Sequence, residues 1–353
     1  MSTRRYLAPP VIEPGRHTYT QTELAAAFRR RLEALEDAEA MRKMVGFVYE
    51  HASIERRHLE ISLDELDARS DWYRLVNEAT AALAQRSVEA LLGPQLPASR
   101  VDALVVVSAS YAGFPSLSRR LQTALELPLE AKCYDLTGLG CAGPTHGLHL
   151  ADMLVATGAA SCVCVVCADA MGTHGESRVH NEVPSMSQLV AHCLASDGAA
   201  ATVVSAAPLS GDAISWTDCQ LHTRLWPGTL AENDFTTSAD NQPLIAVGKE
   251  IRNRLLPELG PMMERIDPGS SYFHPGGAAL MRKLSTSYPA FVDTLEISSG
   301  VLREHGNIGS ASVLWVLHEA WAAGRAFEEQ LRLVALGPGI VATMIEFAGV
   351  ARV

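Results

Sequence analysis

Residues 140–169 have the sequence GCAGPTHGLHLADMLVATGAASCVCVVCAD, in which small residues, an apolar helical run and an apolar extended run follow one another. Glycines around Cys141 predict a sharp turn. Apolar residues at three- and four-residue steps predict a helix over 146–158. The run at 161–169 is typical of a strand that is buried on both faces. The block therefore predicts a turn, a helix and a buried strand.

A second block with the same order begins at Gly306-Asn307. Small residues precede a helical run at 311–324 and an apolar strand at 331–337. A further echo pairs residues 197–205 with 337–347, since each is a glycine-containing turn that enters an apolar strand. Identity between the blocks is low, so the similarity could also arise by chance. If it is real, the chain contains two similar α/β halves, and each half has a polar residue at a helix N-terminus.

The rest of the chain also favours alternating helices and strands. Periodic apolar residues predict helices over 21–50, 71–92 and 117–127, and a short buried strand over 102–110. The first 20 residues carry three prolines and little periodicity, so they are expected to form an extended arm.

Composition excludes several classes of protein. The 353 residues carry 29 Lys and Arg against 40 Asp and Glu, a formal net charge of −11. This charge argues against a protein whose main function is to bind nucleic acid or an anionic membrane. An odd number of cysteines does not suit a secreted disulfide framework, and the N-terminal sequence lacks the apolar core of a signal peptide. We therefore expect a cytoplasmic protein. The seven cysteines are Cys133, Cys141, Cys162, Cys164, Cys167, Cys193 and Cys219.

Cys141 is a candidate nucleophile. The unpaired N–H groups and the dipole of a helix N-terminus favour a thiolate, so this position is expected to lower the pKa of the thiol. The alternative is a small residue that fills a tight turn. Cys162, Cys164 and Cys167 have a spacing that a soft metal could use, but on a strand Cys167 points away from the other two, and buried packing is favoured.

His274 and Asn307 are two further candidates. His274 ends a short apolar run and precedes Pro-Gly-Gly, where a strand turns sharply. Asn307 follows a glycine and precedes a helix. Taken one at a time, a buried core histidine and a helix-capping asparagine are the favoured interpretations.

The motifs together resemble those of the thiolase-fold condensing enzymes, and specifically the chalcone synthase-like, or type III, polyketide synthases of the bacterial type. The resemblance extends from about residue 45 to 347. The segments that carry it are GLGCAG (138–143), FHPGGAAL (273–280), EHGNIGSAS (304–312), LGPGI (336–340), IERRHL (54–59) and LASDGAAATVV (194–204).

This resemblance implies an α/β fold of the thiolase type, in which two similar α/β halves form a layered αβαβα core. We divide the chain into an arm (1–20), an N-terminal half with the nucleophilic cysteine (21–210) and a C-terminal half with the histidine and asparagine (211–353). The family also implies a homodimer.

The resemblance further implies a mechanism. Cys141, as a thiolate beside the imidazolium of His274, would attack an acyl-CoA starter, or malonyl-CoA itself, and hold the acyl group as a thioester. His274 and Asn307 would then stabilise the enolate that forms when malonyl-CoA loses CO₂. Repeated condensation and cyclisation would give a small aromatic compound or a pyrone. No metal or redox cofactor is implied.

The family's substrate-binding positions can be carried over residue by residue. They fall on Ala195, Gly276, Gly277, Ala279, Gly309, Leu336, Gly337, Pro338 and Gly339. Ala195 stands where the family has a phenylalanine, Leu336 where it has an aromatic residue, and Gly309 where serine is common. These smaller side chains predict a wider pocket mouth.

Two other functions remain open. A ketoacyl synthase III-like acyltransferase would perform a single condensation, with a carrier protein as a possible partner, although its histidine is usually followed by Gln-Ala-Asn. A non-catalytic thiolase-fold subunit is the other alternative.

The helix before Ile54 is expected to contact CoA, but Phe47 and His51 replace basic residues there, and Arg42 and Lys43 lie only nearby.

Overall fold

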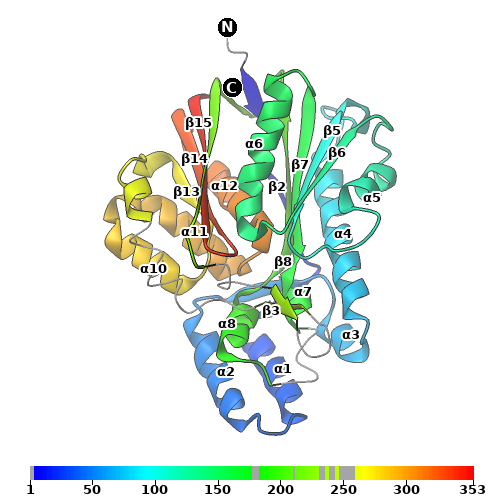
Figure 1. The fold of residues 1–353 in the computed structure, drawn as a ribbon, viewed down its shortest axis with the longest axis vertical. Helices are drawn as coiled ribbons and strands as arrows, with labels where there is room; N and C mark the ends of the chain where they lie inside the picture. The colour runs from blue at the N-terminus through cyan, green and yellow to red at the C-terminus, as the bar shows by residue number, and fades with distance from the viewer. Residues whose placement is uncertain (1–3, 177–182, 210, 230–234, 238–242, 246–258) are drawn as a thin grey trace.

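The computed structural model describes residues 4–176, 183–209, 211–229, 235–237, 243–245 and 259–353 (Figure 1). The boundary that we set at residue 210 lies outside the described residues. The α-helices are α1 (Gln21–Glu33), α2 (Glu39–His51), α3 (Leu63–Ala68), α4 (Trp72–Leu91), α5 (Leu117–Ala124), α6 (Gly143–Ala156), α7 (Met171–Glu176), α8 (Met186–Leu194), α10 (Ala278–Ser287), α11 (Val292–His305) and α12 (Ser312–Ala322). Short 3₁₀ turns are η1 (Ala98–Arg100), η2 (Gly140–Ala142), η3 (Pro268–Ser270), η4 (Pro289–Phe291) and η5 (Gly309–Ala311).

The strands form one large mixed sheet and two small ones. They are β1 (Arg5–Leu7), β2 (Val11–Pro14), β3 (His17–Thr20), β4 (Arg56–Leu59), β5 (Ala103–Ser108), β6 (Lys132–Thr137), β7 (Cys162–Ala170), β8 (Asp197–Ser205), β9 (Ile214–Trp216), β10 (Asp218–Leu225), β11 (Phe235–Thr237), β12 (Pro243–Ile245), β13 (Ser271–Phe273), β14 (Glu329–Gly337) and β15 (Val341–Arg352). The large sheet has the order β13-β14-β15-β9-β1-β8-β7-β5-β6, with β10 beside β15 and β2 beside β8.

The two ends of the large sheet repeat one arrangement. Strands β5 and β7 are parallel, and β8 returns antiparallel to β7. Strands β13 and β14 are likewise parallel, and β15 returns antiparallel to β14. In each half a 3₁₀ turn and a helix precede the long strand: η2, α6 and β7 in one half, and η5, α12 and β14 in the other. The repeated blocks of the sequence thus adopt the same local structure.

Helices α6 and α12 lie between the two halves (Figure 1). Helix α6 contacts β5 and β7 on one side and β14 and β15 on the other, and α12 contacts both β8 and β14. Helices α4 and α5 cover the outer face of the first half, and α10 and α11 cover the second. A helix packed between the two halves must be apolar nearly all round, and most of α12 is buried. The predicted mixed α/β fold with αβαβα layers is confirmed.

The prediction of one helix over 21–50 was wrong in its continuity. Helix α1 ends at Glu33 and α2 begins at Glu39, and Asp37 between them has a left-handed backbone with φ of 58°. A short polar side chain such as that of Asp37 tolerates the left-handed conformation. The spacing of apolar residues carries no sign of such a break in a helix. Before α1, the segment expected to be extended forms β1, β2 and β3, which pair with β8 and β9 of the large sheet and with β4.

The cysteines of β7 are buried on opposite faces of the sheet, as predicted. Cys167 lies in the apolar cluster between the two halves, and Cys162 and Cys164 lie in the cluster under α4. In the part of the chain that the structure describes, no helix is long and apolar enough to cross a membrane.

Candidate active site

Cys141 lies in η2, two residues before the first residue of α6. Gly140 has a left-handed backbone with φ of 50°, and a Cβ there would lie 2.7 Å from Cδ of Pro338. A Cβ on Gly143 would lie 2.3 Å from Cγ1 of Val107 on β5. Glycines therefore let the cysteine turn lie tightly between β5 and the loop after β14.

His274 directly follows β13. Its backbone N–H donates to the carbonyl of Val334 on β14 over 2.8 Å, and its side chain is buried. Within the described residues Nδ1 has no hydrogen-bond partner. A Cβ on Gly276 would lie 3.8 Å from Nε2, so glycine keeps open the space beside that nitrogen.

Asn307 lies between α11 and η5. Its backbone N–H donates to the carbonyl of Leu194 over 2.8 Å, and its carbonyl accepts from the N–H of Ser196 over 2.9 Å. In the side chain, Oδ1 accepts from the Gly309 N–H (3.0 Å) and from Oγ of Ser312 (3.3 Å). Because the amide oxygen is engaged in this way, the two N–H bonds of Nδ2 are the groups left to meet a ligand.

Three sets of contacts bring these residues to one region. Val107 touches the turn of Cys141, and its carbonyl accepts a 3.4 Å bond from Oγ of Ser310, just after Asn307. Strand β14 pairs with β13, the strand that precedes His274, and the end of β14 approaches the Cys141 turn. A Cβ on Gly337, its last residue, would lie 2.8 Å from Cβ of Ala142. Gly277, after His274, approaches Leu194, whose carbonyl binds Asn307.

Asp169, at the end of β7, is a residue that the sequence analysis missed. Its buried carboxylate accepts from the backbone N–H groups of Ala109 (2.7 Å) and Ser110 (2.9 Å) and from the N–H of Ser310 (2.7 Å). It also accepts from the hydroxyls of Ser108 and Ser110. Asp169 therefore ties β5 and β7 to the turn that follows Asn307. A single carboxylate at the end of an apolar strand was the signal for it.

The pKa values differ from the expectation for the cysteine. Burial, with a smaller effect from the charge of Asp169, raises the pKa of Cys141 to about 12. Burial lowers the pKa of His274 to about 4. The position before a helix does not overcome the loss of hydration, so both groups are neutral in this structure.

The structure shows a backbone reason for glycine at position 309, and the effect of Gly309 on the width of the pocket mouth stays a prediction. The Gly309 backbone is left-handed, with φ of 58°, and a Cβ would lie 2.5 Å from Oδ2 of Asp169. Glycine is required there by the backbone and by Asp169. Ala195 and Leu336 are half-buried and differ in their surroundings: Ala195 pairs with Asn307, and Leu336 packs against the apolar cluster around α2 and α11.

The other candidate binding residues lie on two turns. Gly337, Pro338 and Gly339 form the turn between β14 and β15 that packs on η2. The carbonyl of Gly339 accepts from Oγ1 of Thr229 over 2.6 Å, which anchors this turn. Gly276 and Gly277 lead from His274 into α10, where Ala279 is the second residue.

Helix α2 presents few unpaired positive charges. Lys43 Nζ pairs with the carboxylate of Glu39 over 2.7 Å on the exposed surface. Phe47 is 57% exposed and stacks on the ring of His51 with 4.2 Å between ring centroids. An aromatic and imidazole surface therefore occupies the helix expected to contact CoA.

Arg57, also missed, fixes the segment that carries Ala195. Its guanidinium is fully buried and donates to the carbonyl of Ala195 over 2.8 Å. It also pairs with the buried carboxylate of Glu176 at 3.3 Å and donates to Oε1 of Gln21. The segment just before β8, in which Ala195 pairs with Asn307, therefore depends on a buried cation.

Comparison with known proteins supports the resemblance. Residues 44–215 match the family model of the FAE1/type III polyketide synthase-like proteins, and residues 268–349 match the C-terminal domain of the chalcone and stilbene synthases. A curated relative, type III polyketide synthase 21 of Oryza sativa subsp. japonica, is 28% identical over 284 residues, which is 75% of this chain and 71% of the rice protein.

Solved structures show the same fold. Germicidin synthase of Streptomyces coelicolor, a type III polyketide synthase, superposes with a TM-score of 0.81 at 21% identity over 98% of this chain and 99% of that one. CsyB, whose structure is complexed with CoA-SH, superposes with a TM-score of 0.82 at 20% identity over 98% and 100% of the two chains.

Proposed function

Because this chain belongs to the type III polyketide synthase family of condensing acyltransferases, we propose that it loads an acyl-CoA on Cys141 and extends it with malonyl-CoA. The observation that carries the proposal is the meeting of the Cys141, His274 and Asn307 turns through Val107, Leu194 and Gly337. Malonyl-CoA itself is a candidate starter, and cyclisation to a small aromatic compound or pyrone completes the reaction.

In the loading step, the Cys141 thiol transfers its proton to His274, and the sulfur attacks the acyl carbonyl. CoA leaves as its thiol, and the acyl group remains on Cys141 as a thioester. The raised pKa of Cys141 and the lowered pKa of His274 argue against a standing thiolate–imidazolium pair, so in this scheme the proton moves only as the acyl-CoA reacts.

In the extension step, malonyl-CoA loses CO₂ and becomes an enolate whose oxygen needs hydrogen-bond donors. The side-chain amide of Asn307 supplies one donor, because Gly309 and Ser312 occupy its oxygen. Protonated Nε2 of His274 supplies the other. The enolate carbon attacks the Cys141 thioester, the sulfur is released, and the chain grows by two carbons. No metal or redox cofactor takes part in this scheme.

CoA thioesters are the proposed form of both substrates. CsyB is described as complexed with CoA-SH, and its fold is that of this chain. The stacked Phe47 and His51 on α2 offer an apolar surface. A carrier-protein arm is the alternative donor.

We also propose that the chain acts as a homodimer in the cytoplasm. Strand β6 is an edge of the large sheet. Leu129, three residues before β6, and Phe114, between β5 and α5, are large apolar side chains that are 88% and 94% exposed. All seven cysteines are free thiols, which suits a reducing compartment.

Labelled malonyl-CoA tests the function, with and without a panel of acyl-CoA starters, followed by mass spectrometry of products and protein. Incorporation of several malonyl units and an acyl adduct on Cys141 would support it, and Cys141→Ala should condense nothing. Cys193→Ala is a matched control that removes another thiol. An adduct on another cysteine, or none with any starter, would contradict the proposal. A single malonyl unit would favour the ketoacyl synthase III-like reaction instead, and an unreactive Cys141 would favour a non-catalytic subunit.

A further inference from the structure

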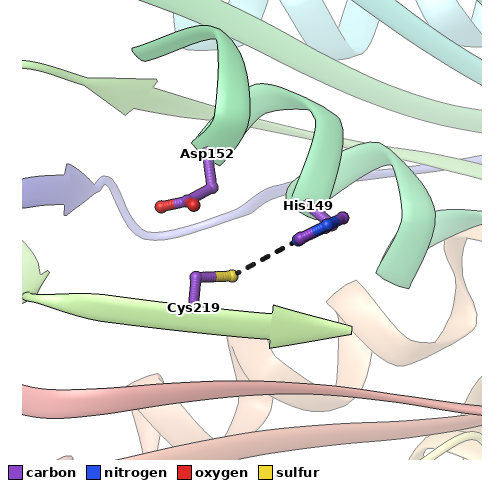
Figure 2. A group of neighbouring side chains, drawn as sticks. All are labelled: His149, Asp152 and Cys219. Carbon is purple, nitrogen blue, oxygen red and sulfur yellow. Dashed lines mark hydrogen bonds between the residues drawn. The ribbon is translucent and has the colours of Figure 1, made fainter. Parts of the chain in front are cut away.

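Three side chains with metal-binding atoms meet between α6 and β10 (Figure 2). His149 and Asp152 are three residues apart on α6 and so share one face of the helix. Cys219 is the second residue of β10 and points toward them. One ligand atom from each residue lies within 4.8 Å of the other two.

We propose that His149, Asp152 and Cys219 form a binding site for one transition-metal ion of the zinc class. Imidazole nitrogen, thiolate sulfur and carboxylate oxygen are the ligands that Zn²⁺ takes in proteins. Hard ions such as Mg²⁺ and Ca²⁺ prefer oxygen ligands, which are a minority here. The proposed function neither uses this site nor depends on it.

The spacing of the cluster is close to that of a bound site. Sγ of Cys219 lies 3.9 Å from Nδ1 of His149. Zinc–sulfur and zinc–nitrogen bonds of ordinary length at a tetrahedral angle would separate these two atoms by about 3.6 Å. A small side-chain rotation therefore brings the atoms to coordination distance without a change in the backbone of α6 or β10.

Asp152 is already held in place. Its Oδ1 accepts from Nε of Arg5 (2.7 Å) and from Nε1 of Trp216 (2.7 Å). Carboxylates that bind metals are commonly fixed by such second hydrogen bonds, which set the orientation of the remaining oxygen. Oδ2 is thus the oxygen assigned to the metal.

The site is open and separate from the residues proposed for catalysis. His149 and Cys219 are half-buried, so water can reach the fourth coordination position. His149 follows Cys141 by eight residues along η2 and α6, a separation of about 12 Å at the helical rise. The cysteines of β7 differ, because they are wholly buried and face opposite sides of the sheet.

Cobalt(II) titration of the metal-free full-length protein tests the site, since a cobalt–thiolate bond gives a charge-transfer band in the near ultraviolet. One Co²⁺ per chain with this band is expected, and Zn²⁺ should displace it. Cys219→Ser should remove the band, and His149→Gln should weaken binding at least tenfold; neither change touches the Asp152 ion pair. Circular dichroism checks that both variants fold.

Controls separate this site from the other thiols. Cys141→Ala and Cys133→Ser should both retain the band and the stoichiometry. Zn²⁺ should also raise the melting temperature of the wild type and of these two controls, but not that of Cys219→Ser. Absence of the band in the wild type, or its persistence in Cys219→Ser, would overturn the proposal.

Discussion

The backbones of Asn307 and Ala195 pair as an isolated parallel bridge. The Asn307 N–H donates to the carbonyl before Ala195, and the Asn307 carbonyl accepts from the N–H after it. A residue proposed for catalysis is thereby fixed against a residue proposed to shape the substrate pocket. A larger side chain at position 195 is therefore expected to alter the surroundings of Asn307.

Ala195→Phe is predicted to change the products. The residue is half-buried beside Asn307, so a phenyl ring there must project into the space next to the proposed site. We expect fewer malonyl units per product and rejection of bulky starters, measured by product mass spectrometry with labelled malonyl-CoA. Ala156→Phe, on an exposed position at the end of α6, is the control and should leave products unchanged. An unaltered product and starter range in Ala195→Phe would refute a gating role.

The sequence was sufficient for the architecture and for the local structure around two of the three proposed catalytic residues. Turn-helix-strand blocks around Cys141 and Asn307 depend on short-range periodicity, which a single chain displays, and both appear as η2, α6, β7 and η5, α12, β14. The break between α1 and α2 depends on the backbone of one residue, Asp37, and leaves no periodic trace.

Long-range electrostatics and contacts could not be predicted in the same way. The pKa of Cys141 is set by burial under elements distant in sequence, which overcomes the local helix position. The backbone requirement for glycine at position 309 was missed because its neighbour Asp169 is 140 residues earlier in the chain. Arg57 was visible only as part of a motif, whereas its burial against Glu176 and Ala195 depends on the folded chain.

Asn307→Ala is predicted to reduce extension by about 100- to 1,000-fold, the usual effect of removing one donor from a developing oxyanion. Transfer of the starter to Cys141 should be affected less, because that step uses the cysteine and histidine. Single-turnover loading, followed by mass spectrometry, and steady-state release of CO₂ separate the two effects. Equal losses in loading and decarboxylation would contradict the assigned role and indicate a collapsed site.

Asp169→Asn is predicted to lower the free energy of unfolding by about 3 kcal/mol. The amide keeps one oxygen for the N–H groups of Ala109 and Ser110, but its NH₂ then faces the Ser310 N–H, which loses its buried acceptor. Activity should fall with stability, since the Ser310 turn follows Asn307. Urea unfolding measures the change, and Asp293→Asn, at an exposed position, is the control. A loss below about 1 kcal/mol would show that these hydrogen bonds do not hold the turn.

Leu129→Glu is predicted to convert a dimer to a monomer. An exposed edge strand with large apolar side chains nearby invites pairing with a second copy, and a charge there opposes it. Light scattering on the full chain should give half the wild-type mass. Val292→Glu changes an exposed apolar residue on α11 instead and should stay dimeric. A monomeric wild type, or a variant that remains dimeric, would contradict the β6 interface.

Stability is predicted to rise with pH between about 4 and 6.5 through His58. Burial, together with the neighbouring His305 and Arg56, lowers the pKa of His58 from 6.5 to about 4. Its Nε2 lies 2.9 Å from Nδ1 of His305, and its Nδ1 lies 3.1 Å from Oγ1 of Thr18. In that pH range the unfolded chain binds a proton at this residue that the folded chain does not. The contribution of His58 to the free energy of unfolding is therefore fully present above pH 6.5. It is lost as the pH falls from 6.5 through 4.

His58→Gln should remove a contribution on the order of 3 kcal/mol from the difference in unfolding free energy between pH 4 and pH 6.5. Urea unfolding across this range gives that difference for each variant, so an overall loss of stability at all pH values does not affect the comparison. His222→Gln, at an exposed position on β10, should keep the wild-type pH dependence. Because the pKa of His274 is also lowered in the folded chain, some dependence of stability on pH must remain in His58→Gln. A pH profile parallel to that of the wild type would show that protonation of His58 does not oppose folding.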